Sequence, residues 1–199
     1  MLESYRSLGL GYLVAIVVGI GLGLAIGRFR LVELALDAQL IALYSTPNVA
    51  LVPLLILWFG LGFEPKVTLV FLSAVFPILL NTQGGVRNVD RSLVDVARAE
   101  GGTEWQIMRK IVLPASLPFV MTGLRLAAGR AVVGMVVAEF FTALSGLGGR
   151  IVYYGGQFAT DKLLAVVIVL ALTGVALTQL VRLIEIRFIP WRESARARA

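Results

Sequence analysis

The stretch DVARAEGGTEWQIMRKIVLP, residues 95–114, carries six charged side chains in a chain that is otherwise apolar. Over all 199 residues the composition is 58% hydrophobic and 15% charged, with a mean hydropathy of +0.89. This balance lies well outside that of soluble domains and indicates an integral membrane protein. The polar stretch needs an explanation of its own, because it stands in the middle of a membrane-embedded chain.

Five apolar runs surround the polar stretch, and each is near the length of about 20 residues that crosses a bilayer. They cover residues 8–27, 40–60, 66–82, 115–141 and 162–181. Because a backbone in lipid has to satisfy its hydrogen bonds internally, all five runs are predicted to be helices. The predicted fold is an all-α membrane protein, a polytopic helical bundle forming a single domain over residues 1–199.

The distribution of Lys and Arg predicts the orientation of this bundle. One set of loops together with the C-terminal tail holds twelve basic residues, and the opposite set holds four. The first set comprises Arg28, Arg30, Arg87, Arg91, Arg98, Arg109, Lys110, Arg182, Arg187, Arg192, Arg196 and Arg198, and the second comprises Arg6, Lys66, Arg150 and Lys162. Because basic loops stay in the cytoplasm, residues 83–110 and the C-terminus are predicted to be cytoplasmic. Five spans then place the N-terminus outside, so a sixth helix before residue 8 is expected.

The absence of Cys and His excludes several kinds of site. Disulfides, thiolate or imidazole metal sites and Cys/His or Ser/His catalytic arrangements all need these residues. No catalytic or metal-binding residue is therefore predicted. The formal charge of +6 does not indicate nucleic-acid binding, because no basic stripe is interleaved with aromatic side chains. The sequence G-x-x-x-x-G-K-[ST] is also absent, so any ATP has to be bound by a partner and this chain is predicted to hold no cofactor.

The first apolar run repeats a small residue at every fourth position. These residues are Gly11, Ala15, Gly19, Gly23 and Gly27. Such a stripe lets a second helix backbone approach closely, where dispersion replaces the hydrophobic drive that lipid does not supply. The stripe is predicted to be a helix-packing surface.

The polar stretch itself predicts two short helices joined by a glycine turn. Asp90 is placed to cap the first helix, and Gly101 and Gly102 provide the backbone freedom to end it. Thr103 and Gln106 form a capping box for the second helix, and Pro114 is expected to end it. Trp105, Met108, Ile111 and Val112 fall at helical spacing and predict its apolar face. From these patterns alone, a solvated connector and an interfacial anchor remain alternatives to a docking surface.

Residues 95–114 resemble the EAA loop of the permease subunits of bacterial ATP-binding-cassette importers. That pattern is E-A-A, three residues, Gly, nine residues, Ile, one residue and Leu-Pro. Every spacing matches in this chain, with Asp in place of Glu and Val in place of Ala at the first two positions. The segments YSTPNVALVPLLILWFGLG, FPILLNTQGGVRNVD and LPFVMTGLRLAAGRAVVGMVVAEFF also resemble the branch that imports nitrate, sulfonates and taurine. Members of that branch normally have six spans.

The resemblance implies a mechanical role for residues 83–113 as a cytoplasmic coupling loop. In the family, the first short helix of this loop docks into a groove on an ATPase subunit, so Asp95, Ala97, Arg98, Glu100 and Gly101 are expected at that joint. The implied partners are a dimer of ATP-binding subunits, which holds ATP and Mg, a second permease copy in a homodimer, and an external solute-binding protein. The implied location is the bacterial inner membrane, among its lipids and without nucleic acid.

Three ionisable residues lie inside the predicted span 115–141, namely Arg125, Arg130 and Glu139. A charge at mid-bilayer costs at least about 2.5 kcal/mol on insertion scales and usually faces the protein interior. Two interpretations are open for the arginines: a pair with a carboxylate of another helix, or contact with an anionic solute. Glu139 is a third candidate for the solute path or a buried ion pair, and because it lies nearer the outer face, the alternative expectation is that it snorkels.

The outer segment 142–161 is glycine-rich, and it is expected either to line an outer gate or to form a flexible loop. An ATPase-independent channel or membrane scaffold remains the alternative function. That alternative makes no use of the spacing in residues 95–114. An intramembrane enzyme is disfavoured, because the spans contain no His and no pair of carboxylates.

Overall fold

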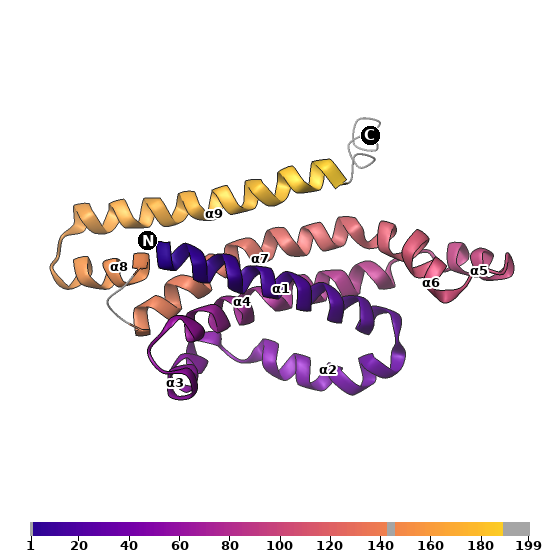
Figure 1. Ribbon diagram of the computed structural model, residues 1–199, viewed down its shortest axis with the longest axis horizontal. Coiled ribbons are helices and arrows are strands. Elements are labelled where there is room, and N and C mark those ends of the chain that lie inside the picture. The colour runs from indigo at the N-terminus through magenta and orange to yellow at the C-terminus, as the bar shows by residue number, and fades with distance from the viewer. Residues whose placement is uncertain (1, 143–145, 189–199) are drawn as a thin grey trace.

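The computed structural model describes residues 2–142 and 146–188, and all regular structure in these ranges is helical (Figure 1). The all-α fold predicted from the composition is confirmed. In chain order the helices are α1 (Leu2–Arg28), α2 (Arg30–Ser45), α3 (Asn48–Phe59), α4 (Phe63–Arg87), α5 (Arg91–Ala99), α6 (Glu104–Ile107), the π-helical turn η1 (Met108–Val112), α7 (Leu113–Thr142), α8 (Gly146–Gly156) and α9 (Thr160–Phe188).

The long helices run along one axis of the molecule (Figure 1). α5 and α6 extend from one end, the end toward which α9 runs, and α8 lies beside the start of α1 at the other end. Four helical stretches have the length and hydropathy of membrane spans, and the pair α2–α3 makes a fifth if its two parts are counted together.

The core of the bundle forms where α4 packs between α1 and α7. The small-residue stripe of α1 faces α4: a Cβ added at Gly19 would lie 2.9 Å from Ile78 Cβ, and one added at Gly23 would lie 2.6 Å from Thr82 Cβ. Gly11 and Gly27 make similarly close approaches to α4, and Ala15 is completely buried. Each glycine in the stripe therefore sets the distance between the two helix axes.

The segment predicted as one helix over residues 40–60 is instead broken. α2 and α3 meet at 97°, and the preceding segment 30–39, predicted as a loop, is the first part of α2. The break lies at Thr46 and Pro47, both of which have extended backbone angles. Proline disfavours a helical conformation in the residue before it and has no N–H for the helix ladder, so two half-helices form in place of one.

The two short helices and both of their caps form as predicted. The Asp90 carboxylate accepts a hydrogen bond from the Ser92 N–H at 2.9 Å, which lowers the pKa of this carboxyl from its ordinary value. Thr103 and Gln106 form the reciprocal capping box. Pro114 does not end the second helix, because helical structure continues from Glu104 to Thr142. The Leu113 N–H donates to the Met108 carbonyl in a π turn, and this wider turn accommodates the proline that follows.

Candidate functional site

A cavity of about 300 Å³ opens where the break between α2 and α3 faces α4 and α7. Its walls include Tyr44 and Thr46 from α2 and the break, and Arg130 and Gly134 from α7. The broken backbone has no continuous helix ladder here, so polar side chains and the facing ends of α2 and α3 line the space. Irregular backbone at membrane depth is tolerated where it lines a cavity of this kind.

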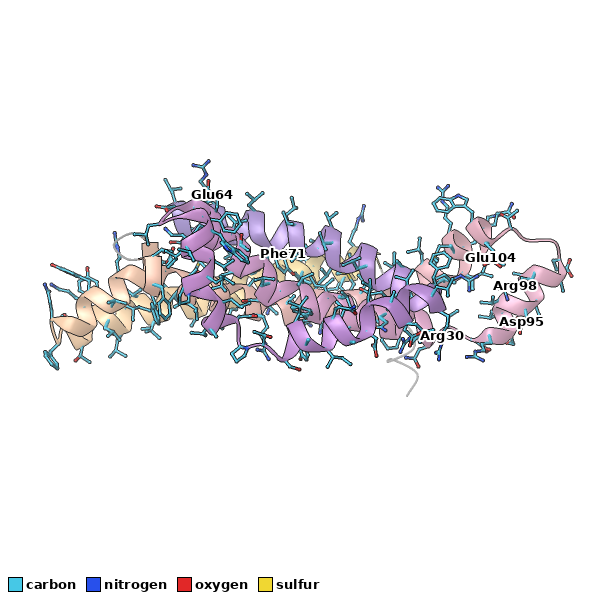
Figure 2. The ribbon with its side chains drawn as sticks, turned by 90° about the horizontal axis from the view of Figure 1, so that it is seen from below. Arg30, Glu64, Phe71, Asp95, Arg98 and Glu104 are labelled. Carbon is cyan, nitrogen blue, oxygen red and sulfur yellow. The ribbon has the colours of Figure 1, made fainter. Side chains whose placement is uncertain are left out.

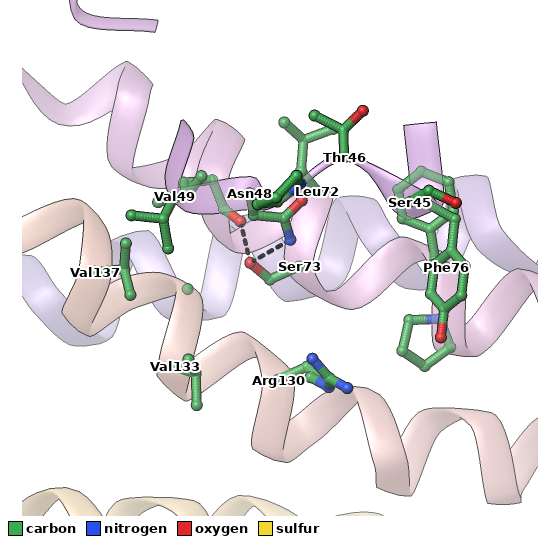
Figure 3. Close-up of a pocket in the computed structure, with 15 residues that line it drawn as sticks. Ser45, Thr46, Asn48, Val49, Leu72, Ser73, Phe76, Arg130, Val133 and Val137 are labelled. Carbon is green, nitrogen blue, oxygen red and sulfur yellow. Dashed lines mark hydrogen bonds between the residues drawn. The ribbon is translucent and has the colours of Figure 1, made fainter. Parts of the chain in front are cut away.

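Asn48 and Ser73 form the polar wall opposite α7 (Figure 3). The Asn48 amide donates to Ser73 Oγ at 3.2 Å, and Ser73 Oγ donates to the Leu69 carbonyl at 2.8 Å. α7 comes close to this pair because position 134 is glycine: a Cβ there would lie 2.5 Å from Ser73 Oγ. The hydrogen bonds fix the orientation of both polar side chains on α3 and α4.

Arg130 lies on the α7 side of the cavity, across from Asn48 and Ser73 (Figure 3). Among the described residues, no carboxylate lies within ion-pair distance of its guanidinium. The structure therefore separates Arg130 from Arg125, which forms an ion pair with Glu185 of α9. Of the two interpretations open from the sequence, the structural pair describes Arg125, whereas Arg130 lines the cavity.

Glu139 does not snorkel, and that expectation is wrong. Its side chain is completely buried near the C-terminal end of α7, where Oε2 accepts a hydrogen bond from the Gly148 N–H at 2.7 Å. Ser4 of α1 accepts a second hydrogen bond from the Leu147 N–H at 3.2 Å. These two side chains satisfy backbone N–H groups in the first turn of α8, so the outer segment is a docked helix over residues 146–156. Residues 143–145 of the predicted outer loop lie outside the described residues.

The α5–α6 corner brings together the residues that the family resemblance singled out. The Gly102 N–H donates to the Ala97 carbonyl at 2.8 Å, and Gly101 has a φ of +78°, in the left-handed region that favours glycine. Arg98 reaches across the corner to Glu104 at 2.9 Å, and at 3.8 Å it also approaches Asp95. Glu100 is exposed beside the turn. Figure 2 shows Asp95, Arg98 and Glu104 gathered at this end of the molecule.

The corner has a buried side and an exposed apolar side. Ile107 and Val112 are buried against the ends of α1 and α4, whereas Leu93, Val96 and Trp105 are 54%, 61% and 71% exposed. The predicted apolar face that grouped Trp105 with Val112 is therefore wrong. The π turn at Met108–Val112 changes the helical register between these residues, so they point to different sides.

Sequence reasoning missed the cavity residues of the break. The signal was present in Ser-Thr-Pro-Asn at positions 45–48, which interrupts an otherwise apolar run. A proline-interrupted hydrophobic segment is a recognised indicator of a binding site built from half-helices. Ser73 carries no comparable signal, because single serines are common in apolar helices.

Residues 15–190 match the family described as binding-protein-dependent transport system inner membrane component. The chain belongs to this family. The permease is 38% identical, over 97% of its length and 70% of the relative's, to a Bacillus subtilis protein named for aliphatic sulfonates transport. It is 33% identical to the taurine transport system permease protein of Escherichia coli, over 94% of its length and 68% of the relative's.

A crystal structure of an amino acid ABC transporter shares the fold, with a TM-score of 0.65 at 17% identity over 92% of the permease and 91% of that chain. The permease is thus a multi-pass inner-membrane subunit of an ABC importer, in the nitrate, sulfonate and taurine branch. It is a transport subunit and not an enzyme, since ATP hydrolysis in these systems occurs in a separate subunit. Family membership also removes the alternative of an ATPase-independent channel or scaffold.

Proposed function

We propose that the permease forms the translocation path for a small anionic solute, and that the cavity at the α2–α3 break is a solute contact on that path. The observation that carries the proposal is the position of Arg130, which lines this cavity opposite Asn48 and Ser73 without a carboxylate partner among the described residues. The cavity volume of about 300 Å³ matches the lower end of small-molecule sites.

The start of α3 supports the choice of an anion. Asn48 and Val49 begin this helix and also line the cavity, and the preceding Pro47 makes no side-chain capping hydrogen bond. The N-terminal end of a helix carries partial positive charge and unsatisfied N–H groups. A half-helix N-terminus and a guanidinium on opposite walls both favour a sulfonate or another small anion over a cation.

The proposal extends to the coupling of this path to ATP hydrolysis. Residues 83–113 are the cytoplasmic coupling loop, and the exposed side chains Leu93, Val96 and Trp105 supply apolar anchors for an ATPase subunit. Between α5 and α6 lies a hollow of about 230 Å³, lined in part by Ala97 and Glu100, which is large enough to receive a partner side chain. ATP and Mg bind to the ATPase subunits.

The remaining partners follow from the same proposal. A homodimer of permeases encloses the path, and an external solute-binding protein delivers the solute. The C-terminal end of α9 lies at the same end of the molecule as α5 and α6. Because the coupling loop and the C-terminal tail are rich in Lys and Arg, the proposal places both in the cytoplasm.

Uptake into proteoliposomes that contain the permease, its ATPase and its binding protein tests the path. Ethanesulfonate, taurine and nitrate serve as probes, and Arg130→Met is compared with Arg150→Met, which removes an exposed arginine on α8. We expect Arg130→Met to lower uptake of the accepted probe by about tenfold or more, as for loss of one charge-assisted contact. Arg130→Lys is expected to retain part of the activity. Unchanged uptake in Arg130→Met, or no uptake of any probe by the wild type, would contradict the proposal.

A further inference from the structure

A second and larger polar cavity, of about 630 Å³, lies between α5 and the ends of α1, α2 and α4. Its lining contains five arginines from four helices: Arg28, Arg30, Arg87, Arg91 and Arg98. No other described cavity gathers so many basic groups. This cavity is distinct from the solute site, because the two share no lining residue.

The carboxylates around this cavity orient its arginines without neutralising all of them. Glu33 pairs with Arg87 at 2.6 Å and approaches Arg30 at 3.6 Å. Glu104 holds Arg28 and Arg98, and Asp95 approaches Arg98. Three carboxylates therefore face five guanidinium groups, leaving an excess of positive charge.

Arg91 is the one arginine of this cavity that pairs with none of the three carboxylates. Within the described residues it has no ion-pair partner, although it lies at the start of α5 and lines the cavity. A guanidinium presents N–H groups in a planar fork that matches the oxygens of a phosphate. A phosphate in this cavity would balance the excess charge and give Arg91 an acceptor.

The depth of the cavity matches the position of lipid headgroups. α1 has 27 residues and α4 has 25, which correspond to lengths of about 40 and 37 Å. Both exceed the hydrocarbon thickness of about 30 Å, so their terminal residues Arg28 and Arg87 lie at the level of the polar headgroups. Basic cavities between the ends of membrane helices have the chemistry that binds anionic headgroups.

We propose that this arginine-lined cavity binds the phosphate of an anionic lipid headgroup. Since Arg91 and Arg98 lie on α5 while Arg28 and Arg87 end α1 and α4, one bound phosphate joins the coupling helix to the spans. A soluble phosphate compound offers the same chemistry, and the experiment separates the two sources. The proposal does not depend on which solute the permease transports.

Native mass spectrometry of the purified permease in detergent tests this binding. The probes are phosphatidylglycerol, phosphatidylcholine with identical acyl chains, and inorganic phosphate as a soluble competitor. Arg91→Gln is the informative variant, because removing the guanidinium of Arg91 breaks no ion pair among the described residues. Arg109→Gln is the matched control: Arg109 is an exposed arginine on η1 at the same end, and it does not line the cavity. Thermal unfolding of each variant checks that the fold is retained.

We expect the wild type to retain phosphatidylglycerol in preference to phosphatidylcholine. Arg91→Gln should weaken this retention by about fivefold, the ratio for one interfacial basic residue, and Arg109→Gln should leave it unchanged. If the lipid stays bound in millimolar inorganic phosphate, the headgroup is the ligand of the cavity. If inorganic phosphate displaces the lipid, the cavity prefers a soluble phosphate, and the lipid assignment is overturned. Equal retention of both lipids, or equal weakening by both variants, would overturn the proposal. Because no ATPase or binding protein is present, this result is independent of the Arg130 transport test.

Discussion

Arg28, the last residue of α1, forms an ion pair with Glu104, the first residue of α6. The same carboxylate also accepts a hydrogen bond from Arg98 of α5 at 2.9 Å. One side chain therefore connects the α5–α6 corner to the end of a membrane span. The carboxylate is 62% exposed, so the pairs contribute more to the position of the corner than to the stability of the fold.

Glu104→Gln should uncouple the corner from α1 while leaving the bundle folded. We expect the free energy of unfolding to fall by less than about 1 kcal/mol, because exposed ion pairs are weak. In the assembled transporter, solute uptake per ATP hydrolysed should fall. Glu64→Gln, which removes an exposed carboxylate at the opposite end of α4, is the control (Figure 2). Equal uptake per ATP in both variants would contradict a role for Glu104 in coupling.

Substitutions at Gly101 should separate backbone conformation from available space. A Cβ at this position would meet no atom within 4 Å, so only the left-handed φ of +78° resists substitution. We expect Gly101→Val to cost about 1–2 kcal/mol of corner stability and to reduce copurification of the ATPase. Gly101→Asn should be tolerated better, because asparagine enters the left-handed region more readily. Identical copurification of the two variants would show that the angle of this turn is unimportant for docking.

Removing the guanidinium of Arg125 should destabilise the contact between α7 and α9. Glu185 is 8% exposed and would lose the charged partner that Arg125 supplies, at a cost of about 1–3 kcal/mol. The partial exposure of Arg125 keeps the cost below that of a fully buried pair. Thermal unfolding of Arg125→Met, Glu185→Gln and the double variant gives the coupling energy. Strictly additive effects would show that the pair contributes nothing.

Two nearby glycines of α1, one inside the small-residue stripe and one outside it, should differ in their sensitivity to substitution. A Cβ at Gly19 would lie 2.9 Å from Ile78 Cβ, whereas one at Gly21 would meet nothing within 4 Å. We expect Gly19→Val to destabilise the permease by about 1–3 kcal/mol through overpacking, and Gly21→Val to change stability by much less. Unfolding in detergent measures both. A larger loss of stability in Gly21→Val than in Gly19→Val would show that α4 packs against the face of α1 that carries Gly21, which would contradict this contact.

Much of this fold could be predicted from local chemistry. The cap at Asp90 and the packing surface formed by the glycine stripe of α1 were both predicted correctly. Their effects depend only on local helix geometry, which the sequence spacing reveals. Pro47 and Pro114 gave opposite outcomes: one breaks a helix, and the other is accommodated after a π turn. Which outcome occurs depends on the hydrogen bonding of the surrounding turns, and single-residue preferences do not determine it.

The candidate site was less predictable, because it depends on contacts between distant segments. Arg125 and Arg130 look alike in the sequence, and only the position of α9 distinguishes the paired arginine from the one in the cavity. The burial of Glu139 was not predicted. Its carboxylate accepts a hydrogen bond from an N–H group of α8, and the sequence pattern did not show that α8 folds back against α7.

The continuous helical stretch from Glu104 to Thr142 connects the α5–α6 corner to the cavity as one rigid rod. Between Glu104 at the corner and Arg130 at the cavity lie 26 steps along the chain, or about 39 Å of helix. Pivoting such a rod by about 5° displaces its far end by about 3 Å. That displacement is comparable to the length of the hydrogen bonds that orient Asn48 and Ser73. With the ATPase bound at the corner as proposed, a slight rotation there suffices to open or shut a polar contact deep in the membrane.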